Sequence, residues 1–152
     1  MIVTPKDQAP ALVRTSSDLT NAAVRRIAVA DPRAVPAGIY ARTRLQAAGL
    51  WPLLQAKIIP TENVRGALAA VESGNVEAGL VYKTDAAVSP RVRVTCEVPA
   101  GGSPEIRYPM ALVSDTRQRA AAERFLKHLA SREVDPVFAK FGFIVRPGEL
   151  HP

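Results

Sequence analysis

Three short, largely apolar runs separated by segments of helical periodicity restrict the fold of this 152-residue chain more than any other feature. The runs are Ile27–Ala30, Lys57–Ile59 and Ala78–Tyr82. Short apolar runs of this kind are typical of parallel strands that are buried on both faces of a sheet. The two segments between them carry apolar residues at helical spacing and end at Gly49 and Gly74, which suit the left-handed position after a helix. The alternation predicts an α/β fold with a parallel sheet and helices on both faces.

The ends of the chain have a different pattern. Ile2–Thr4 is predicted to be a short strand that stops at Pro5, because proline donates no hydrogen bond to a β-ladder. Val92–Glu97 alternates like a half-buried strand, a glycine-rich loop occupies 99–104, and Tyr108–Val113 is predicted to be another strand. We expect the part of the chain from about residue 10 to residue 105 to form one compact lobe.

Two amphipathic helices are predicted to close the chain between residues 114 and 147, partly detached from the lobe. Each has an apolar stripe that needs a surface to cover. The stripes are Ala122, Phe125, Leu126 and Leu129 in the first helix and Val134, Val137, Phe138 and Phe141 in the second.

Composition argues against several function classes. A net charge of +6 raises nucleic acid as a partner, but the arginines are scattered and only 5% of the residues are aromatic, so we expect no nucleic-acid surface. Cys96 is the sole cysteine and is predicted to be a half-buried, inert thiol, and His128 and His151 have no partners at metal-ligand spacing. No run approaches the roughly 20 apolar residues of a membrane span, and Met1–Asp7 lacks the regions of a signal peptide.

Catalytic motifs are absent from the sequence. We find no nucleophile elbow, no phosphate-binding Gly-Lys-Ser/Thr loop, no zinc-protease motif and no dinucleotide fingerprint. Acidic residues such as Glu62, Glu72, Glu77 and Asp85 are explained as helix-end or surface charges. The pattern favours a binding protein, with no catalytic residues and no metal held by side chains.

Hydrogen-bond donors follow each of the three predicted parallel strands, at the edge where open α/β sheets hold ligands. Pro36-Ala37-Gly38 opens one helix and Asn63-Val64 opens the next, and both helix starts expose N–H groups and a positive dipole end. Tyr82 adds a phenolic hydroxyl at the end of the third strand. An anion site is one interpretation of these donors, and the other is that they are ordinary helix starts and a packed tyrosine, which give the same pattern.

Several segments, in order and spacing, resemble the periplasmic molybdate-binding proteins, the solute-binding components of molybdate ABC transporters. The resemblance covers nearly the whole chain. Its segments are Ile27–Pro32, Val35–Ala41, Ala48–Trp51, Glu62–Leu68, Val71–Asn75, Gly79–Ala86, Tyr108–Leu112 and Phe138–Phe143.

The resemblance implies a periplasmic-binding-protein-like α/β lobe that holds molybdate or tungstate through neutral donors. The ligands would be the backbone N–H groups of Ala37 and Val64 and the hydroxyl of Tyr82, with Pro36, Gly38 and Asn63 as possible neighbours. No cofactor is implied besides this ligand. Selectivity against sulfate would then rest on cavity size.

The resemblance also implies a division of the chain. Residues 1–4 would be the first crossover strand between two lobes, residues 5–106 the second, ligand-binding lobe, and residues 107–113 the return crossover strand. Residues 114–152 would be a C-terminal helical remnant of the first lobe. A preceding first-lobe segment, with serine ligands and the export signal, is expected from the family and is not in this sequence.

The implied function is that of the substrate-binding component of an ABC importer, with an ABC permease as partner and a periplasmic location. We expect the chain as it stands to bind the oxyanion weakly and to form a homo-oligomer, because the helical stripes would lack their usual cover. The alternative is an oxyanion-sensing regulatory domain, which is disfavoured because the sequence shows no helix-turn-helix.

Overall fold

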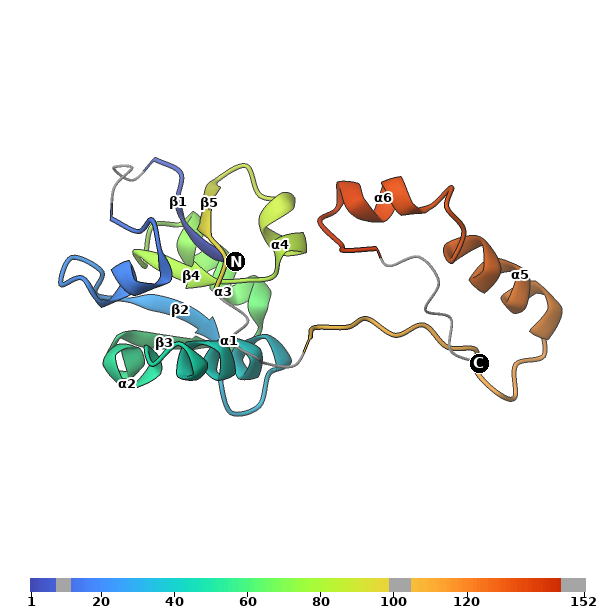
Figure 1. Cartoon of the computed structure of the whole chain (residues 1–152), viewed down its shortest axis with the longest axis horizontal. Coiled ribbons are helices and arrows are strands. Elements are labelled where there is room, and N and C mark those ends of the chain that lie inside the picture. Colours follow the sequence, from blue (N-terminus) through green and yellow to red (C-terminus); the bar gives the residue numbers. More distant parts are fainter. Residues whose placement is uncertain (8–11, 99–104, 146–152) are drawn as a thin grey trace. The chain divides into compact units, whose positions relative to one another are not determined.

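Five strands form the sheet of the first of two units. The computed structural model describes residues 1–7, 12–98 and 105–145, and the chain divides into Met1–Glu105 and Ile106–Pro152. The strands lie in the order β3-β2-β4-β1-β5 (Figure 1). Their bounds are Ile2–Pro5 (β1), Ile27–Ala30 (β2), Ile58–Thr61 (β3), Ala78–Leu80 (β4) and Val92–Cys96 (β5).

The α/β class is confirmed, but the sheet is mixed. β2 lies parallel to both of its neighbours, with Ile27 paired to Ile58 of β3 and to Ala78 of β4. β1 runs antiparallel to β4 and to β5. The parallel arrangement predicted for β2, β3 and β4 is confirmed, and β1 adds an antiparallel neighbour whose direction was not predicted. The apolar runs identify buried strands, but they carry no information on the direction in which β1 enters the sheet.

Helices cover both faces of the sheet. Because side chains alternate along a strand, Ile27 and Val29 of β2 point to one face and Ala28 points to the other. The first face packs against η1 (Ser16–Thr20), α1 (Pro36–Ala47) and α2 (Trp51–Leu54), which η2 (Gln55–Lys57) links to β3. The second face packs against α3 (Val64–Glu72) and α4 (Lys83–Ala87).

The predicted helix ends agree with the structure. Gly49 and Gly74 have φ values of 70° and 71°, the left-handed conformation that favours glycine after a helix. Asn63, predicted to lie at the start of the second helix, is the N-cap of α3. Two boundaries differ: β3 starts one residue later than predicted and extends to Thr61, and β4 ends at Leu80 so that Tyr82 precedes α4, a helix the sequence did not predict.

A buried carboxylate joins β2 to β4 at the amino end of these strands. The Oε2 atom of Glu77 accepts the N–H groups of Arg25 at 3.0 Å and Arg26 at 2.7 Å. Glu77 is 8% exposed, so its interpretation as a surface or helix-end charge is wrong. Burial acts to raise the pKa of Glu77, but the two N–H bonds and the Arg26 guanidinium outweigh it and lower that pKa.

The second unit contains the two predicted helices, α5 (Arg119–Leu129) and α6 (Asp135–Lys140). Edge-to-face ring contacts link Phe143 to Tyr108 at 5.3 Å and to Phe138 at 5.7 Å between centroids. The return strand predicted at 107–113 is not formed, because this segment pairs with no strand among the described residues. None of the described helices is long and apolar enough to cross a membrane. The predicted loop at 99–104 lies outside the described residues.

Candidate functional site

The carboxyl ends of β2, β3 and β4 lie at one edge of the sheet, because the three strands are parallel neighbours. The backbone links the ends directly, since the N–H of Asp31 donates to the carbonyl of Thr61 at 2.9 Å. From this edge the chain enters α1 on one face and α3 on the other (Figure 1). In open α/β sheets, ligands usually bind at the carboxyl edge where the connecting helices change face beside a central strand.

The first turn of α1 presents backbone donors at this edge. Pro36 is the first helical residue after the cap Val35, so Ala37 and Gly38 occupy the second and third positions. The hydrogen-bond ladder of the helix begins only with Ile39, whose N–H donates to the Val35 carbonyl at 2.9 Å. The N–H groups of Ala37 and Gly38 precede that ladder and lie at the positive end of a 12-residue helix.

The first turn of α3 has the same form on the other face. The Asn63 side chain is the cap and accepts the Gly66 N–H at 2.9 Å, while the Asn63 carbonyl accepts the Ala67 N–H at 3.2 Å. These two bonds leave the N–H groups of Val64 and Arg65 ahead of the ladder. Asn63 therefore orients the helix start, and Val64 lies at its first position.

Tyr82 is the residue before α4 and is half-buried. Its N–H donates to the Oδ2 atom of Asp85 at 3.2 Å, and its carbonyl accepts the Ala86 N–H at 3.1 Å. Both main-chain groups are thus bound within the first turn of α4. The structure places the backbone of Tyr82 at the carboxyl edge that also holds the starts of α1 and α3; its role as a hydroxyl ligand stays a prediction.

Two carboxylates lie at the same edge and were not assigned to the site from the sequence. The Oδ1 atom of Asp31 accepts the N–H and Nε of Arg33 at 2.9 and 3.2 Å, and Oδ2 accepts Nη2 at 3.2 Å. These bonds lower the pKa of Asp31 and balance its charge within its own turn. Burial raises the pKa of Asp85, although the Tyr82 N–H and the charge of Arg65 act against that rise.

The chemistry of this edge is that of hydrogen bonding. Cys96, the last residue of β5, lies at the same edge and is half-buried. Burial raises the pKa of its thiol and so disfavours the reactive thiolate. The described residues contain no group of three or more His, Cys, Asp or Glu side chains that could hold a metal ion. The edge holds one tyrosine and two helix starts whose first N–H groups make no bond within their helix. These groups are hydrogen-bond donors of the kind that bind an anion.

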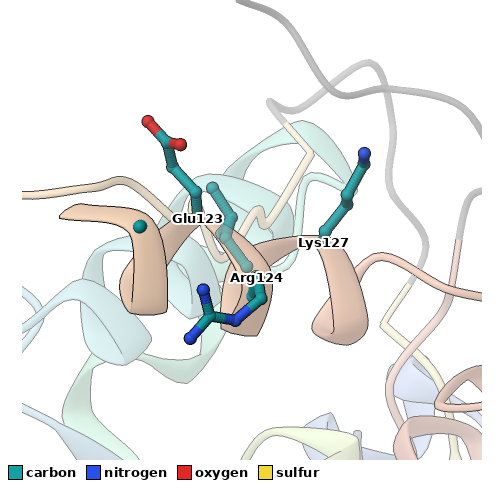
Figure 2. A pocket seen from close by; sticks show the side chains of 5 residues that line it. Glu123, Arg124 and Lys127 are labelled. Carbon is teal, nitrogen blue, oxygen red and sulfur yellow. The ribbon is translucent and has the colours of Figure 1, made fainter. Parts of the chain in front are cut away.

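Two surface hollows lie in the second unit. One, of about 510 Å³, is lined by Ala120, Glu123, Arg124, Leu126 and Lys127 (Figure 2). All five residues come from α5, and in Figure 2 Arg124 points away from Glu123 and Lys127. The other, of about 470 Å³, is lined mainly by apolar residues of 109–113 and α5. Neither brings polar groups from several elements onto one point, as a small-molecule site requires.

The chain is similar to known proteins over most of its length. A family model described as bacterial extracellular solute-binding protein matches residues 1–144. A Bacillus subtilis protein named as an ABC transporter substrate-binding lipoprotein is 43% identical over 118 residues, which are 78% of this chain and 45% of that protein. The Molybdate-binding protein ModA of Escherichia coli is 39% identical over 121 residues, 80% of this chain and 47% of that protein.

Structural similarity agrees with these matches. A solved structure from Clostridium difficile, described as the substrate binding domain of a molybdenum ABC transporter, superposes with a TM-score of 0.82 at 29% identity. The superposition covers 97% of this chain and 62% of that one. The chain spans about half the length of the curated relatives it matches.

Proposed function

This chain belongs to the family of bacterial extracellular solute-binding proteins, and we propose that its first unit binds a tetrahedral oxyanion, molybdate or tungstate. The observation that carries the proposal is the common edge onto which the starts of α1 and α3 and the Tyr82 segment converge. The relatives named as molybdate-binding support the choice of ligand. The ligands proposed are the N–H groups of Ala37 and Val64 and the hydroxyl of Tyr82, with Pro36, Gly38 and Asn63 around them.

Neutral donors suit a doubly charged oxyanion at this edge of the sheet. A helix start offers N–H groups together with a partial positive charge, and hydrogen bonds to an ionised acceptor are stronger than those between neutral groups. Because no full counter-charge is needed, the site would choose among dianions by the size of the cavity. Molybdate and tungstate would then be favoured over the smaller sulfate.

In the cell, the proposed role is delivery of the oxyanion to an ABC permease from the periplasm. The description of the family as extracellular and the names of the relatives as parts of ABC transporters support this role. The proposal assigns the chain no reaction and no cofactor, since molybdenum or tungsten would arrive as the transported ligand.

We propose that these 152 residues, tested by themselves, hold the ligand weakly. The resemblance to two-lobed relatives implies two to four more hydrogen bonds from another lobe, at about 1.5–3 kcal/mol each for a charged acceptor. Binding to these residues alone would have on the order of 3–12 kcal/mol less stabilisation, and even the low end of that range is more than about a hundredfold in affinity. The titration below is designed for a dissociation constant of about 1 mM, which corresponds to a binding free energy of about −4 kcal/mol.

The test is a titration of the uniformly ¹⁵N-labelled chain with molybdate, tungstate and sulfate, followed by amide chemical shifts. We expect the Ala37 and Val64 amides to shift and saturate with molybdate or tungstate by about 10 mM, and to respond much less to sulfate. Equal responses to all three anions would mean that the anions bind only through unselective charge attraction. No response at either amide would overturn the proposed site.

A further inference from the structure

We propose that Gly38 is a positioning residue for the oxyanion site. Because it has no side chain, the first turn of α1 packs directly against the end of β2, and this packing determines the position of the Ala37 N–H. This inference rests on the proposed function. It concerns the third helical position of α1, one residue after the predicted ligand.

The contact at Gly38 is closer than any side chain permits. A Cβ atom on Gly38 would lie 2.0 Å from the carbonyl oxygen of Ala30 and 2.6 Å from that of Asp31. Both atoms belong to the backbone at the carboxyl end of β2, so no flexible side chain can turn aside. Cβ atoms essentially never approach other heavy atoms to within 3.0 Å, so alanine here requires a movement of about 1 Å.

The end of β2 is held more firmly than the start of α1. The Asp31 N–H donates to the carbonyl of Thr61 in β3 at 2.9 Å, which ties the end of β2 to the sheet. β2 itself lies between two hydrogen-bonded neighbours in the sheet. The first turn of α1 has no ladder bond of its own before Ile39. An added methyl group would therefore displace the helix start and not the strand.

Gly66 provides an internal comparison, because it is the third helical residue of α3 as Gly38 is of α1. A Cβ atom on Gly66 would meet nothing closer than the Thr61 Cβ at 3.4 Å, an ordinary contact. The Gly66 N–H is already bound to the Asn63 side chain, so it is no ligand in the proposed site. Glycine at this position is thus dispensable in α3 and required in α1.

The expected consequence is the loss of one ligand. A hydrogen bond of ordinary length is no longer formed when its donor moves back by about 1 Å. Gly38→Ala should lower molybdate affinity by about tenfold or more, the effect of losing a single hydrogen bond to a charged group. Gly66→Ala should leave the affinity unchanged.

The experiment measures amide shifts of the unsubstituted chain, Gly38→Ala, Gly66→Ala and Gly79→Ala during molybdate titration. Gly79 is the control for general crowding, because its Cβ would meet the Val71 Cγ2 at 2.6 Å in the core. We expect Gly38→Ala to weaken binding and to abolish the response of the Ala37 amide while the Val64 amide still responds. A purely structural effect would reduce both responses together and would appear in Gly79→Ala as well.

Each outcome decides one question. Absence of binding by the unsubstituted chain rejects the proposed function. Binding by that chain and by Gly38→Ala with equal affinity rejects the positioning role alone. Loss of the folded spectrum in Gly38→Ala, with both control variants folded, also rejects it, because Gly38 would then be needed for the fold and not specifically for the site.

Discussion

The backbone N–H of Tyr82 donates to the Asp85 carboxylate at 3.2 Å, and this bond fixes the residue proposed as a hydroxyl ligand at the start of α4. Asp85 lies three residues further along, where a carboxylate suits both the free N–H groups and the dipole of a helix start. The same carboxylate is partly buried and interacts with the charge of Arg65, at the start of α3. Asp85 thereby couples the segments that carry two of the three proposed ligands.

Replacing Tyr82 with Phe should weaken oxyanion binding by about 1.5–3 kcal/mol, the usual effect of a hydrogen bond to a charged group. The Asp85 bond uses the main chain of Tyr82, so the variant should keep its fold. Molybdate titration followed by amide shifts measures the affinity, and circular dichroism checks the fold. If the Tyr82→Phe variant binds as tightly as its parent, the Tyr82 hydroxyl is not a ligand.

Asp85 should make stability depend on pH with an unusual sign. Because burial raises its folded-state pKa above the ordinary 3.8, the stability that Asp85 contributes is complete below the unfolded pKa and is lost as pH rises through the folded pKa. Asp85→Asn keeps an oxygen for the Tyr82 N–H but cannot ionise. Urea unfolding between about pH 3 and pH 7 should show the variant gaining stability relative to its parent as pH rises. A constant difference would contradict the assignment.

Glu77 should show the opposite sign. Its lowered folded-state pKa means that its contribution is present above the unfolded pKa and is lost as pH falls through the folded one. Glu77→Gln should cost about 1–3 kcal/mol near neutral pH, because the N–H groups of Arg25 and Arg26 lose a charged acceptor. Urea unfolding measures the loss.

Glu123→Gln is the matched control for this substitution. Glu123 also pairs with an arginine, Arg119 at 2.9 Å, but its side chain is 52% exposed on α5. An exposed pair of this kind contributes about 0.3–0.5 kcal/mol. If the two variants lost equal stability, burial of Glu77 would not be the cause of its effect.

The sequence predicted those parts of the fold that depend on local pattern. The buried run Ile27–Ala30 and the glycines after α1 and α3 each carry a signal that needs no distant partner. The direction of β1 and the absence of a strand at 107–113 depend on which strands pair, and pairing is decided between distant segments.

The candidate site divides in the same way. The helix starts at Ala37 and Val64 could be located from capping and strand-end patterns alone. The burial of Glu77 and the close packing of Gly38 could not be predicted, because each depends on residues elsewhere in the chain. The Glu77 carboxylate depends on Arg25 and Arg26, and Gly38 depends on the backbone of Ala30. A lone glycine or glutamate in a sequence gives no signal for such a contact.

The second unit should cause the chain to associate with copies of itself. Its helices leave large apolar side chains exposed: Phe125 is 62% exposed, Val137 52% and Phe141 46%. Apolar groups gathered on two amphipathic helices favour association, since their burial removes them from water at about 25 cal/mol per Å². A second copy of the unit offers the same surface, which is the usual basis of a symmetric homodimer.

Light scattering over a range of concentrations measures this association. We expect a homo-oligomer for the unsubstituted chain and a shift toward monomer for the double variant Phe125→Ser, Val137→Ser. Lys127→Ser is the control, since Lys127 is exposed on the same helix as Phe125 but carries a charge in place of an apolar group. Because the substituted side chains already lie in solvent, their loss should leave the helices largely intact, and a change in mass would report the surface itself. A monodisperse monomer at all concentrations would reject association through these helices.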